Sequence, residues 1–295
     1  MKLLVTGAQG QVAQSLVAAQ SSHDVVAIGR PDLDITDIDT VRRHIGAVEP
    51  AVVVNCAAYT AVDKAESETE AAERANASGA GNVARACNEA GIPVIHISTD
   101  YVFDGEKPTP YLETDYTGPR SAYGRTKLAG EEMVAIANPR HLILRTAWVY
   151  SPYGNNFVKT MLRLAATRPE LGVVDDQLGS PTYAPHLAEA IVAILEQIER
   201  QPHAIDWGVY NAAGAGETTW CGFAREVFQV SQEAGGPSAV VSAITTAEYP
   251  TPARRPANSR LDGGKLKSVF GIGLQHWTEG VRACVSALLA HSRVS

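Results

Sequence analysis

Short apolar runs alternate with amphipathic stretches along this chain of 295 residues. The runs are rich in β-branched residues and are bounded by Gly, Pro or polar residues, which is typical of buried parallel strands. We expect strands at residues 2–5, 24–29, 51–55, 92–97, 141–145, 171–174 and 208–211. Strands that alternate with helices predict an α/β fold: a Rossmann-type doubly wound parallel sheet with a smaller C-terminal lobe.

The stretches between the strands carry apolar residues at helical spacing. We expect helices at residues 38–48, 63–90, 123–136, 155–167 and 183–201, and a shorter one through Val12, Leu16 and Val17. Two more helices are expected in the C-terminal third. The first has an apolar face of Trp220, Phe223, Val227 and Val230, and the second of Val281, Cys284, Val285, Leu288 and Leu289.

A glycine turn, Gly7-Ala-Gln-Gly10-Gln-Val-Ala13, joins the first expected strand to the first expected helix. In this context small residues let the backbone approach a pyrophosphate, and the helix N-terminus offers amide donors to it. The spacing G-x-x-G-x-x-A departs from the G-x-G-x-x-G fingerprint, and a glycine turn alone is often only a turn. At the start of a βαβ pattern it favours a dinucleotide site.

The second expected strand ends at Arg30, about 20 residues beyond the turn, where an NAD-specific site carries an acid for the ribose. An arginine there favours the 2′-phosphate of NADPH, and the alternative is an arginine that faces solvent. Asp32 and Asp34 lie close by and keep NADH open as a second cofactor.

A second chemical signal is the pair Tyr123 and Lys127, which open an expected helix on one face. An ammonium beside a phenol favours phenolate and lowers the phenol pKa, which suits proton transfer. Thr99, at the end of an expected strand, can add a hydroxyl on the same substrate oxygen. By itself such a pair is more often a half-buried aromatic with a lysine that reaches solvent.

Composition narrows the classes of partner. The chain has 25 basic and 32 acidic residues, a net charge of −7, and basic pairs only at Arg42-Arg43 and Arg254-Arg255. We therefore expect no nucleic-acid and no membrane partner. The four cysteines are far apart and suit a reducing compartment, and no apolar stretch reaches the length of a signal or a membrane span. The expected location is cytoplasmic.

Several other residues are candidates with an open alternative. Trp148 follows a strand and suits either ring stacking or core packing. Residues 250–261 form a proline-stiffened segment that carries Arg254, Arg255 and Arg260, suited either to a diphosphate or to solvent. Residues 104–121 are expected to form a loop over the cleft. Asn76, inside an expected helix, is equally a site residue or a solvent-facing one, and Asp175-Asp176 lacks a third acid for a metal.

The longer motifs resemble the dTDP-4-dehydrorhamnose reductases, a family of extended short-chain dehydrogenases/reductases, and the resemblance covers essentially the whole chain. The motifs are Asn55-Cys-Ala-Ala-Tyr-Thr60-Ala-Val-Asp63-Lys-Ala-Glu66, Ser98-Thr-Asp-Tyr-Val-Phe103, Tyr123-Gly-x-Thr-Lys127-Leu-Ala-Gly-Glu131, Arg145-Thr-x-Trp-Val-Tyr150, Gly154-Asn-Asn-Phe157 and Pro252-Ala-Arg-Arg-Pro256-x-Asn-Ser-Arg260-Leu261. They are far more specific than the glycine turn.

The resemblance implies reduction of the C4 ketone of dTDP-4-dehydro-β-L-rhamnose by NADPH or NADH, the last step of dTDP-L-rhamnose synthesis. It implies Tyr123 as the general acid, Lys127 as the residue that holds the nicotinamide ribose and lowers the tyrosine pKa, and Thr99 as the residue that polarises the carbonyl. The implied cofactor residues are Gly7, Gly10, Gln11, Val12, Arg30, Asp34, Ile35, Ala57, Ala58, Tyr59, Thr60, Tyr123 and Lys127. The implied substrate residues are Thr99, Asp100, Val102, Phe103, Tyr123, Trp148, Arg254 and Arg255.

One departure from the family concerns metal and assembly. Some members form a dimer bridged by Mg²⁺ through glutamates, and the matching positions here are Ser15 and Pro185. This argues against bound Mg²⁺ and against that dimer, so no metal site is predicted and the chain is expected to be a monomer or a homodimer.

Two alternatives to the reductase remain: another nucleotide-sugar enzyme, an epimerase or a dehydratase, for which Asp100 beside Thr99 would serve, and a non-catalytic NADP-binding regulatory subunit. We divide the chain into an NAD(P)-binding domain of residues 1–147 and about 183–213, and a substrate-binding lobe of about 148–182 and 214–295.

Overall fold

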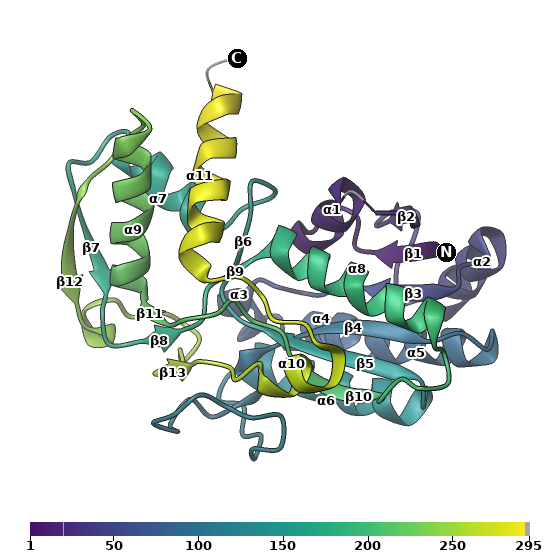
Figure 1. The fold of residues 1–295 in the computed structure, drawn as a ribbon. Helices are drawn as coiled ribbons and strands as arrows, with labels where there is room; N and C mark the ends of the chain where they lie inside the picture. The colour runs from purple at the N-terminus through teal and green to yellow at the C-terminus, as the bar shows by residue number, and fades with distance from the viewer. Residues whose placement is uncertain (20, 293–295) are drawn as a thin grey trace.

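A six-stranded parallel sheet forms the centre of the molecule, and the computed structural model describes residues 1–19 and 21–292 (Figure 1). Its strands are β1 (Lys2–Thr6), β2 (Asp24–Ile28), β3 (Val52–Asn55), β4 (Val94–Thr99), β5 (His141–Thr146) and β10 (Gly208–Asn211). They lie in the order β10-β5-β4-β3-β1-β2, and every neighbouring pair is parallel. The expected Rossmann-type sheet is confirmed.

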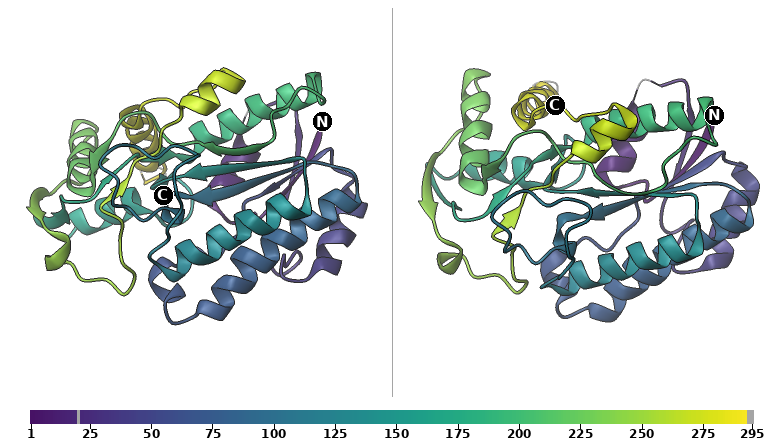
Figure 2. Two further views of the ribbon diagram at one scale, coloured as in Figure 1. Left: turned by 90° about the horizontal axis from the view of Figure 1, so that it is seen from below. Right: turned by 60° about the horizontal axis from the view of Figure 1, so that its bottom comes forward.

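Helices cover both faces of this sheet (Figure 2). One face packs on α1 (Gln11–Ala18), α8 (Ala184–Arg200) and α10 (Gly264–Phe270), and the other on α2 (Ile38–Val48), α5 (Ala80–Glu89) and α6 (Ala122–Ala137). Strands buried on both faces must be apolar throughout, which explains the runs of Val, Ile and Leu.

The order of the strands reverses between β1 and β3, because β1 is followed by β2 on one side of it and by β3 on the other. Open parallel sheets bind ligands at such a switch point, outside the carboxyl ends of the strands. The second lobe lies beyond these same ends (Figure 1). The topology therefore places the glycine turn that follows β1 at this switch point.

The prediction of one long helix at residues 63–90 is wrong. The stretch is divided into α3 (Val62–Ala65), α4 (Thr69–Glu73), a π-helical turn (Arg74–Gly79) and α5. The wider turn places Asn76 in the interior, where its side chain bonds to the backbone of Tyr59 and to Thr126. A π-turn of this kind is frequent at functional sites.

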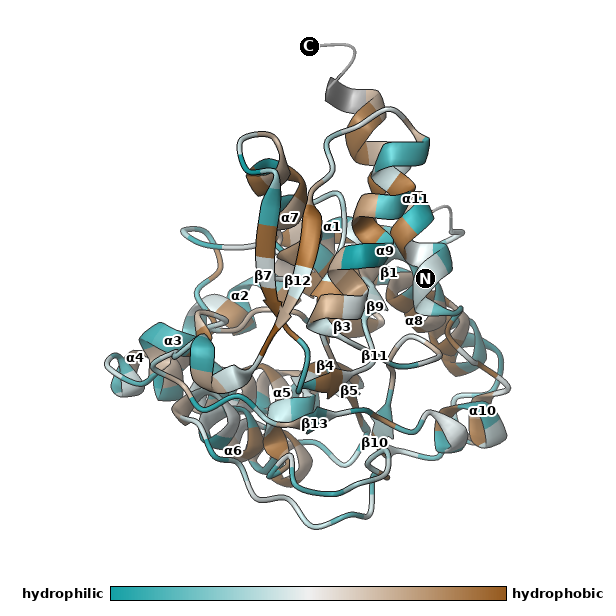
Figure 3. Ribbon diagram, turned by 90° about the vertical axis from the view of Figure 1, so that its left-hand side faces the viewer, coloured by the Kyte–Doolittle hydropathy of each residue, from teal (hydrophilic) through white to brown (hydrophobic). Residues whose placement is uncertain are grey.

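The second lobe has its own apolar core between α7 (Phe157–Ala165), α9 (Trp220–Glu233), α11 (Trp277–Ser292) and a two-stranded parallel sheet of β7 (Glu170–Val174) and β12 (Val240–Ile244). The two strands lie side by side in front of the helices (Figure 3). The expected helices are confirmed, whereas β12 and α10 were not expected.

Short strands join the lobe to the sheet. They are β6 (Val149–Tyr150), β8 (Leu178–Gly179), β9 (Thr182–Tyr183), β11 (Thr218–Thr219) and β13 (Asn258–Ser259). Leu266 and Phe270 of α10 pack in the core of the sheet, not in that of the lobe. We therefore propose the division given above with α10 added to the NAD(P)-binding domain.

Candidate active site

The glycine turn between β1 and α1 forms a cradle at the switch point. Gly7 has a φ of +73°, and its carbonyl oxygen accepts the amide of Gly10 at 2.8 Å. A Cβ on Gly7 would lie 2.8 Å from the Cα of Ala57, so only glycine fits there. Gly10 caps α1 without a side-chain hydrogen bond, which leaves the first amides of the helix to an anion. The turn thus fits a dinucleotide pyrophosphate.

Gln11, in the first turn of α1, ties this cradle to the second lobe. Its Nε2 donates to the carbonyl oxygen of Val149 at 3.3 Å, and its Oε1 accepts from Ser151 at 2.8 Å and from Asn156 at 3.0 Å. Val12, the next residue, is buried in the core. The two lobes therefore meet at the start of the helix that would face a cofactor.

The predicted ribose residues follow β2 at the same edge of the sheet. The Arg30 side chain is exposed there. The Asp34 carboxylate accepts the amide and hydroxyl of Thr36 at 2.9 and 2.8 Å, and Ile35 is buried. The exposed Arg30 guanidinium suits a phosphate on the ribose, which the Asp34 carboxylate would repel.

Residues 57–60 follow β3 and form the other wall of the cradle. Tyr59 is held by Asn76, whose Oδ1 accepts the Tyr59 amide at 2.7 Å and whose Nδ2 donates to the Tyr59 carbonyl oxygen at 3.1 Å. Ala57 and Ala58 are half-buried and Thr60 is exposed. Asn76 is therefore a positioning residue of the site, and the sequence carried no local sign of which way its side chain turns.

Tyr123 lies in the first turn of α6, which Ser121 caps by accepting the Gly124 amide at 3.1 Å. The side chain of Thr99 acts on its phenol, and its ring meets Tyr101 edge to face with centroids 5.5 Å apart. Burial raises the pKa of Tyr123 above its ordinary value. The phenol therefore stays protonated at neutral pH, as a proton donor must.

Lys127 lies one turn after Tyr123 and is only 1% exposed. Its Nζ donates to the carbonyl oxygen of Ile97 at 2.7 Å and lies 3.3 Å from Nε2 of His96. Burial lowers the pKa of Lys127 to about 8, against the opposing effects of Glu131 and Cys56. The expected lowering of the Tyr123 pKa by this lysine is not found, because burial of the phenol dominates and Nζ is held by β4.

Asp100 is a buried carboxylate between Thr99 and the second lobe. Its Oδ1 accepts the Thr99 hydroxyl at 2.9 Å, whereas its Oδ2 has no hydrogen-bond partner within the part of the chain that the structure describes. Burial raises the pKa of Asp100 to about 6, and the smaller effects of Ser259 and Thr99 oppose this. An orphan acceptor beside Tyr123 suits a substrate hydroxyl.

We predict that the substitution Asp100→Asn changes the pH dependence of stability. The folded pKa of about 6 lies above the unfolded value of 3.8, so wild type loses stability relative to the variant as pH rises through this window. The difference in unfolding free energy should grow by about 2 kcal/mol between pH 4 and pH 8. Denaturant titrations at several pH values measure it.

The matched control is Asp104→Asn, because a hydrogen bond from the Tyr111 hydroxyl lowers the pKa of Asp104. This carboxylate contributes stability above its unfolded pKa and loses it as pH falls, so the sign of the difference is reversed. An Asp100→Asn difference that stays flat with pH, or that changes in the same direction as for Asp104→Asn, would contradict the assignment.

Trp148 closes the site on the side of the second lobe. It has a φ of +48°, and its ring stacks on Trp220 with centroids 3.6 Å apart. The indole also lies against Gly179, where a Cβ would come within 2.3 Å of the ring. Trp220 donates to Gln177 at 3.2 Å. The strained backbone of Trp148 is thus held by its packing on Trp220, a residue that periodicity assigned only to a helix face.

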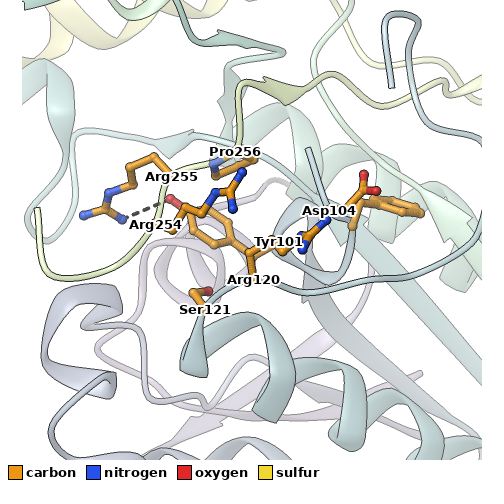
Figure 4. Close-up of a pocket in the computed structure, with 8 residues that line it drawn as sticks. Tyr101, Asp104, Arg120, Ser121, Arg254, Arg255 and Pro256 are labelled. Atoms are coloured by element: carbon orange, nitrogen blue, oxygen red, sulfur yellow. Dashed lines mark hydrogen bonds between the residues drawn. The ribbon is translucent and has the colours of Figure 1, made fainter. Parts of the chain in front are cut away.

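The three arginines of the proline-stiffened segment have different surroundings. Arg255 donates to the hydroxyl of Tyr101 at 3.0 Å (Figure 4) and to Asp63 at 2.7 Å. Arg254 is exposed and pairs with Glu106, which also accepts from Arg120. Arg260 is buried against Glu217 and Asn258. Arg254 and Arg255 therefore lie beside Tyr101, and Arg260 is structural.

Two of these arginines, Arg254 and Arg255, line a small cavity beside Tyr101 that is drawn in Figure 4. Its lining also includes Phe103, Asp104, Arg120, Ser121 and Pro256. The two predicted substrate residues that follow Tyr101 in the chain have buried side chains. Val102 is fully buried, and the Phe103 ring stacks on Tyr111 with centroids 4.2 Å apart. Arg120 and Tyr101 were not singled out from the sequence, although Tyr101 lies within a quoted motif.

Two positions match the glutamates that bridge Mg²⁺ in some members of the family that the sequence resembles, and both have structural roles in this chain. Ser15 is buried and donates to the carbonyl oxygen of Gln11 at 2.8 Å, and Pro185 lies in the first turn of α8. Among residues 1–19 and 21–292, no cluster of three His, Cys, Asp or Glu side chains is arranged to hold a metal ion. Over the same residues, no helix combines the length and apolar character needed to cross a membrane.

Comparison with known proteins adds a family to this geometry. A family model described as RmlD substrate binding domain matches residues 1–290. A dTDP-4-dehydrorhamnose reductase of Sinorhizobium fredii is 51% identical over 294 residues, 99% of each chain. The crystal structure of such a reductase from Clostridium acetobutylicum is 39% identical with a TM-score of 0.90, over 98% of this chain and 100% of that one. That from Bacillus anthracis, solved with NADP, is 34% identical with a TM-score of 0.88, over 97% and 99%.

Proposed function

This chain belongs to the family of the dTDP-4-dehydrorhamnose reductases, and from this premise we propose that it catalyses the last step of dTDP-L-rhamnose synthesis. It reduces the C4 ketone of dTDP-4-dehydro-β-L-rhamnose to the alcohol, with NADPH as the preferred cofactor and NADH as the alternative. The observation that carries the proposal is the set of Thr99, Tyr123 and Lys127, gathered at the carboxyl edge of the sheet in a chain that matches the family over its length.

The residues present fit the cofactor. The cradle of Gly7, Gly10 and Ala57 would hold the pyrophosphate, Arg30 the 2′-phosphate, and Tyr59 and Lys127 the nicotinamide end. When bound, NADPH supplies the hydride, and the protein supplies binding and orientation. A solved relative in complex with NADP supports this choice.

Tyr123 donates its phenolic proton to the oxygen at C4 of the sugar. Thr99, whose side chain acts on the phenol, would share that oxygen. Lys127, one helical turn after Tyr123, keeps its ammonium on β4, where it would hold the nicotinamide ribose. Because burial raises the pKa of Tyr123, the phenol is protonated at the start of each turnover.

The substrate would be held by three groups around the phenol. Asp100 offers its unpaired Oδ2 to a sugar hydroxyl, and Trp148 covers the ring. Arg254 and Arg255 would meet the diphosphate, which as a dianion favours guanidinium donors. Arg255 donates a hydrogen bond to the hydroxyl of Tyr101, and the ring of Tyr101 packs on that of Tyr123. Binding of the diphosphate would therefore be linked to the position of Tyr123.

The assembly and location are also proposals. We propose a monomer or a homodimer without bridging metal, because Ser15 and Pro185 lack the required carboxylates. A cytoplasmic location fits the four cysteines, which are all free thiols.

One assay tests the function: loss of NADPH absorbance when dTDP-4-dehydro-β-L-rhamnose is added. Steady oxidation of NADPH in proportion to the sugar supports the reductase. An epimerase would convert the sugar with no net oxidation of NADPH, and a regulatory subunit would bind NADPH without turnover. Either result would reject the proposal.

We predict that Arg30→Ala shifts the cofactor preference. The variant should lose roughly 10- to 100-fold in kcat/KM for NADPH, the worth of a charge-assisted contact to phosphate, and little for NADH. Steady-state kinetics with both cofactors measure this ratio. Arg168→Ala, at an exposed arginine in the second lobe, is the control. Equal losses with both cofactors would mean that Arg30 does not meet the 2′-phosphate.

A further inference from the structure

A row of polar side chains runs through the sheet beneath Lys127. Thr6, Asn55 and His96 are direct cross-strand partners on β1, β3 and β4, and all three are buried. Thr6 Oγ1 lies 2.6 Å from Asn55 Oδ1, and Asn55 Nδ2 lies 3.0 Å from His96 Nδ1. The row ends at His96 Nε2, 3.3 Å from Lys127 Nζ.

A histidine at this position is costly unless it has a task, because its neighbours along β4 are apolar and its ring is 1% exposed. Burial and the nearby Lys127 lower the pKa of His96 well below its ordinary value. A neutral imidazole has one donor nitrogen and one acceptor nitrogen. With its proton on Nδ1 it presents the lone pair of Nε2 to an ammonium, whereas a second cation at this distance is excluded.

The hydrogen bonds of this row can adapt to either charge state of Lys127. When the Asn55 amide nitrogen faces Nδ1, the ring proton lies on Nε2 and faces an uncharged amine. When the amide is reversed, the ring proton lies on Nδ1 and Nε2 accepts from the ammonium. The other ionisable groups that act on Nζ are Glu131, one turn further along α6, and Cys56, after β3. Neither contacts Nζ, so His96 and the Ile97 carbonyl oxygen alone hold it within the described residues.

We propose that His96 is a positioning residue of the reduction, which fixes Nζ of Lys127 under the reacting groups and sets the pH range over which that nitrogen stays charged. The proposal rests on the proposed function, since it assigns Lys127 a role in turnover. It follows that removal of the imidazole acceptor lowers the lysine pKa further, because the ammonium loses one of its two partners while its burial is unchanged.

The test compares His96→Leu and His96→Gln with wild type. Gln can place an acceptor oxygen near the position of Nε2, whereas Leu offers none. His23→Leu is the matched control, since His23 is also buried but lies at the opposite end of the sheet, against the chain N-terminus. Thermal unfolding is measured for all variants, together with kcat from pH 6 to pH 9.5 and NADPH affinity over the same range.

For His96→Leu we expect kcat at pH 8 to fall roughly 10- to 100-fold, the cost of a displaced catalytic group. The alkaline limb of the plot of kcat against pH should shift about one pH unit lower in this variant. His96→Gln should recover most of both effects, and His23→Leu should keep the wild-type profile. An unchanged pH profile in His96→Leu, or equal losses in Leu and Gln variants that track their thermal stability, would overturn the proposal.

NADPH affinity separates this proposal from the function itself. It is measured by binding fluorescence without the sugar, and it should weaken in wild type as Lys127 loses its proton, with the midpoint at lower pH in His96→Leu. If wild type fails to turn over the sugar while this midpoint moves, the function is rejected and the role of His96 stands. If wild type turns over normally and the midpoint is the same in His96→Leu, the role of His96 is rejected and the function stands.

Discussion

The substitution Tyr123→Phe should lower kcat by roughly 10²- to 10⁴-fold, the contribution of a positioned general acid. Only the hydroxyl is removed, so the edge-to-face contact with Tyr101 and the start of α6 are retained. Thr99, whose side chain acts on this hydroxyl, keeps its own hydrogen bond to Asp100. We therefore expect NADPH affinity and thermal stability close to those of wild type.

The pH profile gives this prediction a second measurement. Burial raises the pKa of Tyr123, so ionisation of the phenol lies above the assay range, whereas Lys127 titrates near pH 8. The alkaline loss of wild-type activity should follow the lysine. Tyr116→Phe is the control, because Tyr116 is 87% exposed and lies on the loop before α6. Full activity in Tyr123→Phe would remove this residue as the acid.

The sheet and its cofactor edge could be predicted because their signals are local. A buried parallel strand needs an unbroken apolar run, and the turn after β1 needs glycine, since any Cβ would meet the backbone of Ala57. The helix α2 was predicted with the observed bounds, Ile38–Val48. Its Asp37 cap and amphipathic period are both legible in the sequence.

The division of residues 63–90 could not be predicted, because its cause lies elsewhere in the chain. Ala and Glu favour one continuous helix over this range. The π-turn follows from Asn76, which is drawn inward by the backbone of Tyr59 and by Thr126 on another helix. Gly130 permits the approach, since a Cβ there would lie 2.0 Å from the Asn76 carbonyl oxygen. Tertiary contacts outweigh local propensity here.

The direction of side chains was the weakest part of the prediction for the site. Helical spacing correctly places Tyr123 and Lys127 on one face, but the ammonium turns to His96 and Ile97, some thirty residues earlier in the chain. Likewise Arg254, Arg255 and Arg260 form one sequence cluster and have three separate partners. The sequence shows which groups are close to the site, and the packing of the sheet decides which atoms they meet.

The largest effect on stability is expected from Arg145→Met, in the buried ion pair beneath the site. Arg145 contacts both carboxylate oxygens of Glu131, at distances from 2.6 to 3.2 Å, and each side chain is 5% exposed. Its guanidinium also covers the Phe103 ring, with 5.0 Å to the centroid. Removal of one partner leaves a buried charge unpaired, which costs about 3 to 5 kcal/mol of unfolding free energy.

Two further variants separate the loss of charge pairing from the loss of packing. The double substitution Arg145→Met with Glu131→Gln should recover much of the stability, because an uncharged amide needs no counter-charge and can still accept from Ser98. Arg42→Met removes a pair of similar geometry with Glu89 on the surface, where water replaces the partner, and should change little. Denaturant unfolding measures all three. If Arg145→Met is as stable as Arg42→Met, the pair does not support the floor of the site, and if the double variant is no better than the single one, the loss lies in the packing of the guanidinium on Phe103.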